Sequence, residues 1–282
     1  MKPLTPKSTT QKPAPPSARS TPDLLALPTT PQVYRAYAAL AQPLDAQRGR
    51  KPGGQLLVAF SLSAESIAWA IAGCVAGLAV LLVEESAESA KQMLRLGLSD
   101  FVVSDLTEAL QILKNQIRKA QPVSVCLCAP LEPCAQAMAE RGVQPEFMAG
   151  VLPAAATPLL ARGAILLKAA SSQAPVQTEQ CLLWRLRSKQ SSWGERLLAH
   201  VDRLAAQALN EQPKQHEETQ DAGWRKRWLL RSPRYLGRIL GAEHCLCLEE
   251  PELERLKAML HENPELDAQV ELIAICNAGE NI

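Results

Sequence analysis

Hydrophobic and polar residues follow a regular pattern in the first half of the chain. Short apolar runs are typical of buried parallel strands, and here each is followed by a stretch with helical spacing. The expected strands lie at residues 55–60, 78–86, 100–104, 122–129, 146–152 and 162–170. The expected helices lie at residues 33–44, 63–76, 89–97, 105–120 and 132–142. This alternation predicts an α/β fold, with a Rossmann-like parallel sheet that carries helices on both faces.

One segment of this pattern allows a second interpretation. About eighteen uncharged residues separate Glu65 from Glu84, which is long enough to span a bilayer. However, Ser63 is a good N-cap, Glu65 suits the first turn of a helix, and Gly77 suits its end. A membrane span would also leave the following strand–helix units without their first strands. We therefore expect a helix and a strand here, and no transmembrane segment.

The rest of the chain divides into regions of different composition. Residues 1–30 are basic and rich in proline, which predicts a disordered tail. We expect the Rossmann-like domain at residues 31–170, a linker at 171–180, and a mostly helical accessory region at 181–282. Helices are expected there at residues 182–209 and 224–263, and residues 270–276 either add a strand or cap a helix pair.

Composition and charge narrow the function only slightly. Lys and Arg total 30 against 29 acidic residues, so the overall charge gives no reason to expect a nucleic-acid binder. The eight cysteines are scattered among hydrophobic residues, and the N-terminal sequence lacks the apolar run of a secretory signal. We therefore expect reduced cysteines and a cytoplasmic protein.

A family resemblance runs through several of the predicted elements. It is carried by Leu56, Leu57, Val58, Gly77, Val83, Glu84, Leu94, Arg95, Gly97, Asp100, Asp105, Leu106, Glu108, Ala109, Leu110, Ser124, Val125, Leu127, Glu140, Arg141, Gly142, Val143, Pro145 and Glu146. In this register, residues 54–148 resemble the central Rossmann-like domain of urocanases. The resemblance implies a tightly bound NAD and a urocanate hydratase-like lyase.

The chain departs from this family where the cofactor would bind. The glycine-rich turn of the family falls on residues 60–67, which contain no glycine. Such glycines adopt positive φ and let a pyrophosphate approach the helix N-terminus. Glu65 would lie beside the phosphates, at a cost of about 4 kcal/mol for an effective dielectric near 20. The active-site run of the family falls on residues 150–153, and its carboxy-terminal half has no counterpart here.

We therefore expect a degenerate urocanase-like protein, a pseudoenzyme with no bound cofactor and with an interaction or regulatory role. Its partner would be another protein or a second copy of the chain. The alternative is a urocanate hydratase-related enzyme, or a protein that holds a nucleotide or another small ligand at an altered site. That ligand would lie at the vestigial cofactor positions Ser61, Ser63, Ser66 and Glu84, of which Glu84 falls where a ribose-binding carboxylate would be.

Two groups of cysteines could suggest metal ligands. Cys126 and Cys128 precede Cys134, and a second group follows His244 at Cys245 and Cys247. Neither has the C-x2-4-C spacing of zinc sites, and alternation along a strand suits small buried side chains. We expect no metal and no catalytic cysteine.

Residues 224–238 form the one marked asymmetry of charge. Its basic residues occur beside Trp224, Trp228 and Tyr235 without an intervening acid, and they are Arg225, Lys226, Arg227, Arg231, Arg234 and Arg238. Such a segment could bind nucleic acid or an anionic membrane surface. We favour a packed amphipathic helix, with Trp228, Leu229 and Leu230 inward and the arginines solvated or paired with the acidic run at 249–254.

Overall fold

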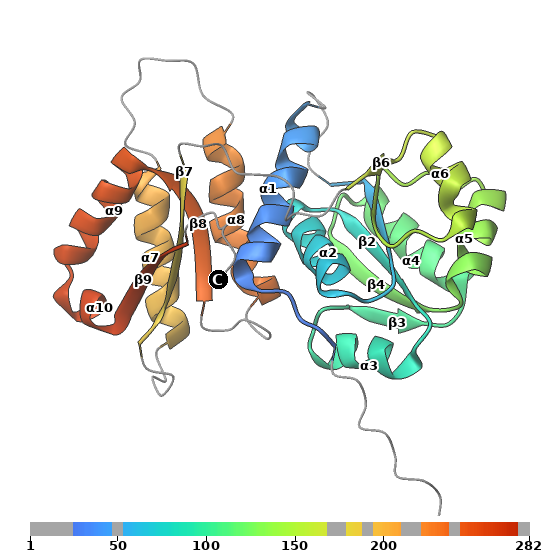
Figure 1. Ribbon diagram of the computed structural model, residues 1–282, viewed down its shortest axis with the longest axis horizontal. Coiled ribbons are helices and arrows are strands. Elements are labelled where there is room, and N and C mark those ends of the chain that lie inside the picture. The colour runs from blue at the N-terminus through green and yellow to red at the C-terminus, as the bar shows by residue number, and fades with distance from the viewer. Residues whose placement is uncertain are drawn as a thin grey trace, which may run out of the picture.

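The computed structural model describes residues 25–46, 53–167, 179–187, 194–209, 221–236 and 243–275 (Figure 1). Most of the predicted tail, most of the predicted linker and Arg238 lie outside these residues. The last two residues of the predicted linker, 179 and 180, begin a strand.

The first part of the chain forms a six-stranded sheet in which every neighbouring pair is parallel. Its order is β3-β4-β2-β1-β5-β6. The strands are β1 (Leu56–Phe60), β2 (Ala79–Glu84), β3 (Phe101–Val103), β4 (Val123–Cys128), β5 (Phe147–Gly150) and β6 (Ile165–Leu166). The chain runs from β1 to β2 on one side and returns to β5 on the other. The topological switch point, where ligands bind to such sheets, therefore lies at the carboxyl ends of β1 and β5.

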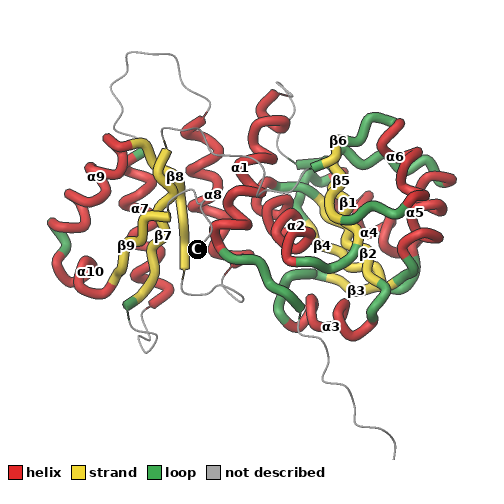
Figure 2. The backbone as a smooth tube through the Cα atoms, in the orientation of Figure 1, coloured by secondary structure: helices red, strands yellow, loops and turns green. Residues whose placement is uncertain are grey.

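Helices cover both faces of this sheet, as the strand pattern predicted (Figure 2). They are α1 (Thr30–Ala46), α2 (Ala64–Ala76), α3 (Ala87–Arg95), α4 (Leu106–Arg118), α5 (Leu131–Glu140) and α6 (Thr157–Ala161). Leu57 and Ala59 of β1 pack on the side of α1, α2 and α3, whereas Val58 and Phe60 pack on the side of α4 and α5. The α/β Rossmann-like fold is confirmed.

Helix α2 explains the long uncharged segment. All its residues from Ser66 to Ala76 are buried, because the sheet lies on one side and α1 and α8 lie on the other. The hydroxyl of Ser63 caps its start, and Gly77 with φ 101° ends it. No helix in the described part of the chain is both long and apolar enough to cross a membrane.

In the second part of the chain, the described residues form four helices and an antiparallel sheet of order β8-β7-β9. The elements are β7 (Glu179–Leu186), α7 (Gly194–Ala208), α8 (Asp221–Leu236), β8 (Glu243–Glu249), α9 (Glu250–His261), α10 (Pro264–Gln269) and β9 (Val270–Ile275). Helices predominate among the described residues, as predicted. The helices expected at residues 182–186 and 243–249 are wrong, because both segments are strands, whereas the strand alternative for residues 270–275 is confirmed.

One hydrophobic cluster joins the two parts. Helix α1 lies between the two sheets (Figure 1), and the rings of Tyr34 and Tyr37 pack on Trp224 and Trp228 of α8. The hydroxyl of Tyr37 donates to the carbonyl oxygen of Trp224 at 2.9 Å. The same cluster continues from α2 through α8 into β7 and β8. The accessory region therefore buries the outer face of α2.

Candidate functional site

The turn between β1 and α2 has the backbone of a glycine turn but no glycine. Ser61, directly after β1, has φ 62°, a conformation that costs an ordinary residue about 1–2 kcal/mol. Its backbone N–H donates to the carbonyl oxygen of Val83 at 2.8 Å. The Ser63 hydroxyl accepts the N–H of Ser66 at 3.1 Å and lies 3.0 Å from the Ser66 hydroxyl. Neighbouring groups therefore already satisfy these polar atoms.

The carboxylate of Glu84 holds this turn from the end of β2. Its Oε2 atom accepts the backbone N–H of Leu62 at 2.9 Å, and its Oε1 atom accepts the N–H of Ser86 at 2.9 Å. Leu62 belongs to the turn where phosphates would bind, so Glu84 supplies an anion to that turn from within the chain. Both carboxylate oxygens of Glu84, the residue expected to bind a ribose, therefore already accept hydrogen bonds.

Two further carboxylates act in the same way at this edge of the sheet. Oε1 of Glu85 accepts the N–H of Leu131 in the first turn of α5 at 3.1 Å. The two oxygens of Glu132 accept the N–H groups of Ala154 and Ala155 at 2.8 and 2.9 Å. Backbone donors in the loops after β1, β2, β4 and β5 are therefore satisfied by the carboxylates of the protein itself.

The end of β5 closes against the same turn. Gly150 has φ 81°, and a Cβ atom there would lie 2.6 Å from the Phe60 carbonyl oxygen and 2.7 Å from the Ser66 hydroxyl. Ser66 itself is fully buried. Ser66 is thus part of the packing between α2 and β5, and it does not face a ligand.

Comparison with known proteins identifies the first part of the chain. Residues 33–155 match the family model of the urocanase Rossmann-like domain, from within α1 to the short 3-10 helix after β5. The urocanase resemblance is confirmed for these residues. No curated protein matches the chain. The matched region contains β1 to β5 and the turn described above.

The NAD of urocanases does not fit the β1–α2 turn of this protein. The structure places Ser61, Ser63, Ser66 and Glu84 at one turn. Ser63 and Ser66 contact each other, the Ser61 N–H donates to the backbone, and Glu84 accepts two backbone N–H groups. A phosphate on the Leu62 N–H would have to displace the Glu84 carboxylate. The exposed Glu65 adds a second negative charge at the start of α2.

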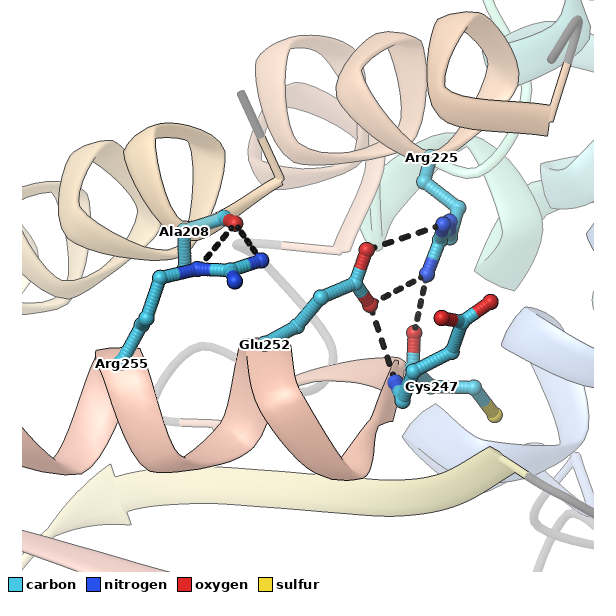
Figure 3. A network of polar contacts seen from close by, with 6 residues as sticks. Ala208, Arg225, Cys247, Glu252 and Arg255 are labelled. Carbon is cyan, nitrogen blue, oxygen red and sulfur yellow. Dashed lines mark hydrogen bonds and ion pairs between the residues drawn. The ribbon is translucent and has the colours of Figure 1, made fainter. Parts of the chain in front are cut away.

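The basic segment forms most of α8, and its first arginine is buried. Arg225 is 4% exposed and donates to both oxygens of Glu252, at 2.7 and 3.2 Å (Figure 3). It also donates to the carbonyl oxygen of Cys247 at 3.4 Å. Glu252 in turn accepts the N–H of Glu249 in the capping box of α9. The expected pairing with the acidic run is confirmed at Arg225, which the fold uses internally.

The remaining residues of α8 divide between two faces. Trp228 is fully buried and donates from Nε1 to the Cys245 carbonyl oxygen at 2.7 Å, and Leu229 is buried beside it. The expectation that Leu230 packs inward is wrong, because Leu230 is 81% exposed. Arg231 and Arg234 are also exposed, while Lys226 and Arg227 are half-buried. The guanidinium of Arg231 donates to the Val75 carbonyl oxygen at 3.4 Å, and that of Arg234 lies 5.6 Å from the ring centre of Tyr235.

The cysteines of the sheet are small buried side chains. Cys126 and Cys134 are buried, and desolvation raises the pKa of their thiols to about 12 and about 11. Cys128 is half-buried, and its thiol lies 3.8 Å from the Glu85 carbonyl oxygen. Within the residues that the structure describes, no group of three or more His, Cys, Asp or Glu side chains is arranged to hold a metal ion.

Sequence reasoning missed one buried polar network. Nδ1 of His244 lies 2.9 and 2.8 Å from the two oxygens of Asp202, and Trp184 donates from Nε1 to Asp202 at 3.0 Å. The network connects β8, α7 and β7. Asp202 and His244 are far apart in sequence and belong to no short motif, so no local signal could have identified the pair.

Proposed function

We propose that this protein is a pseudoenzyme that uses a urocanase-like Rossmann domain as a scaffold, has an interaction or regulatory role, and binds no NAD. The observation that supports this most directly is the position of Glu84. Its carboxylate occupies the backbone donors of the turn that would hold the cofactor phosphates. The glycine-free turn and the carboxylates of Glu85 and Glu132 support the same proposal.

The electrostatic repulsion between Glu84 and a bound pyrophosphate is large enough to support the proposal. Two unit charges about 4 Å apart interact by about 4 kcal/mol at an effective dielectric near 20. A phosphate at Leu62 would meet the Glu84 carboxylate at about this separation, or would displace it and lose its two charge-assisted hydrogen bonds. Each such bond contributes about 1.5–3 kcal/mol. Either cost is about half of the binding free energy of a micromolar ligand, which is about 8 kcal/mol.

Native mass spectrometry of protein purified without added nucleotides tests the absence of the cofactor. We expect the mass of the bare chain or a multiple of it, and no heat of binding when NAD is titrated in. We also expect no loss of urocanate when it is incubated with protein and NAD. Stoichiometric NAD in the purified protein would refute the proposal.

A thermal-shift screen tests the alternative of an altered ligand. A nucleotide present at 100 times its Kd stabilises a protein by about 2.7 kcal/mol. A nucleotide that stabilises the wild type but not Ser63→Ala or Glu84→Gln would place a ligand at the altered turn and would favour the enzyme hypothesis.

The cysteines support a reducing compartment. All seven cysteines in the described residues are free, and most are buried. We therefore propose a cytoplasmic location, where thiols stay reduced. Fractionation of the native host cell, with a cytoplasmic marker enzyme measured in parallel, tests this location.

A further inference from the structure

Four side chains form a stripe on the solvent side of α8. Arg227, Leu230, Arg231 and Arg234 are spaced three or four residues apart, which places them on one face of a helix. We call these four residues the α8 stripe. The opposite face is buried against α1, α2 and the C-terminal sheet through Trp228 and Leu229. The stripe is therefore not needed to close the hydrophobic core.

The exposure of Leu230 separates the stripe from an ordinary solvated face. At 81%, Leu230 is more exposed than any other large hydrophobic side chain in the described residues. Arg227 lies one turn before Leu230, Arg231 is the next residue, and Arg234 lies one turn after Leu230. A single exposed leucine is common, but a leucine that shares one helix face with three arginines matches one kind of partner. That partner has a surface on which negative charges lie directly beside apolar groups.

The aromatic residues of the helix decide between two anionic partners. Single-stranded nucleic acid binds through bases stacked on exposed aromatic rings. Here Trp228 is fully buried, and Trp224 packs against Tyr34 and Tyr37. These rings are engaged in the core, so they do not form a platform for bases. Leu230 likewise has no role in phosphate binding.

The geometry points to an anionic bilayer, and we propose that the α8 stripe docks this protein on the surface of a membrane rich in acidic phospholipids. The arginines contact phosphate and carboxylate headgroups, and Leu230 enters the boundary with the acyl chains. The contact is peripheral. This proposal names a partner for the interaction role proposed above, but it does not depend on whether NAD binds.

Flotation with lipid vesicles tests the proposal. We expect the full chain to bind vesicles of phosphatidylcholine with phosphatidylserine, and not vesicles of phosphatidylcholine alone. Raising the salt from about 0.1 M to about 1 M shortens the Debye length from about 10 Å to about 3 Å and is expected to release the protein. Each basic residue near such a surface contributes about a fivefold gain in partitioning. The double variant Arg227→Glu/Arg234→Glu is therefore expected to bind at least about twentyfold more weakly.

The choice of variants separates an effect of the α8 stripe from an effect of net charge and from a loss of folding. Arg231 is left unchanged because it donates to the Val75 carbonyl oxygen. The matched control is Lys114→Glu/Lys119→Glu, which makes the same change of charge at exposed residues on and just after α4. The control is expected to bind as the wild type does. Circular dichroism and thermal unfolding of each variant check that the fold is retained.

Leu230 provides a readout that charge alone would not change. Leu230→Ser is expected to weaken vesicle binding at constant charge. Leu230→Trp is expected to show a blue-shifted emission on phosphatidylserine vesicles, relative to the wild type, as the new ring enters the interface.

Three results would overturn the proposal. One is the absence of binding to phosphatidylserine vesicles, and another is equal binding by the stripe variant and the control. The third is binding to single-stranded or duplex DNA that requires the stripe, without binding to vesicles, which would assign the stripe to nucleic acid. The NAD titration is a separate experiment, so the two proposals can fail independently.

Discussion

Glu84→Gln tests the contact on which the cofactor argument depends. The amide keeps the size of the side chain, but it offers one acceptor oxygen and one NH2 group. One of the two backbone donors, Leu62 N–H or Ser86 N–H, then faces another donor. A hydrogen bond to a charged group contributes about 1.5–3 kcal/mol, and the partial exposure of Glu84 reduces this value. We therefore expect Glu84→Gln to lower the free energy of unfolding by about 1–2 kcal/mol.

Two measurements check this expectation. Urea unfolding at neutral pH gives the loss of global stability, and hydrogen exchange reports the local effect at the Leu62 and Ser86 amides. Both amides should exchange faster in the variant. Glu88→Gln is the control, because Glu88 pairs with Arg95 where both side chains are more than half exposed, at 53% and 66%. Such a pair contributes less than about 1 kcal/mol.

The result that would refute the reasoning is specific. If Glu84→Gln costs no more than Glu88→Gln and leaves the exchange of Leu62 unchanged, the carboxylate does not hold the turn. The backbone donors of the turn would then be available to an anionic ligand. The main argument against bound NAD would fail with them.

Four further predictions concern Arg225, Ser61 and the cysteines of the sheet. Arg225→Met should destabilise the protein by about 3–5 kcal/mol because it leaves the buried Glu252 unpaired, and Arg225→Met/Glu252→Leu should recover at least half of this loss in urea unfolding. Ser61→Gly should raise the free energy of unfolding by about 0.5 kcal/mol, because glycine relieves the strain of the positive φ by more than it adds freedom to the unfolded chain. Ser61→Val should lower the free energy of unfolding. Equal stabilities of the two variants in urea unfolding would contradict both expectations. In a Cys276→Ser background, a thiol reagent at pH 8 should modify Cys128 well before Cys126 and Cys134. Burial also raises the pKa of the Cys126 and Cys134 thiols, to about 12 and about 11. As the pH rises, these thiols therefore lose their protons first in the unfolded chain, so the free energy of unfolding in urea should fall above about pH 9.

The Rossmann-like half could be predicted because its signals are local. Every residue of β1 is buried, and so is β2 up to Val83, so both read as continuous apolar runs. The caps at Ser63 and Asp105 are side chains that bond the backbone three residues later, which a short sequence window contains.

The C-terminal sheet could not be predicted in the same way. The middle of β8 is buried at every position, and β7 lies between two other strands. A short apolar run without alternation cannot be distinguished from a buried turn of helix by its periodicity. Residues 182–186 and 243–249 also adjoin strongly helical segments, so the pattern predicts helix there. Pairing with distant strands decides the outcome here.

In the candidate site too, one feature could be predicted from the sequence and another could not. The absence of glycine from residues 60–67 is visible in the sequence, and it predicted that the turn would not hold NAD as urocanases do. The carboxylates that accept the backbone N–H groups at this edge were not predictable as a group. Glu84 meets Leu62 across 22 residues, and Glu132 meets Ala154 across 22 residues, so both contacts depend on the finished sheet.

Helix α2 connects the closed turn to the exposed stripe. Its start carries the turn that Glu84 holds, and near its end the Val75 carbonyl accepts a hydrogen bond from Arg231 of the stripe. Between these ends it is buried by the sheet, α1 and α8. Opening the turn for a pyrophosphate would therefore require α2 to move against a packed core on both sides. Because this edge is fixed from within, we expect a partner to bind at the exposed charges of α8 and not at this edge.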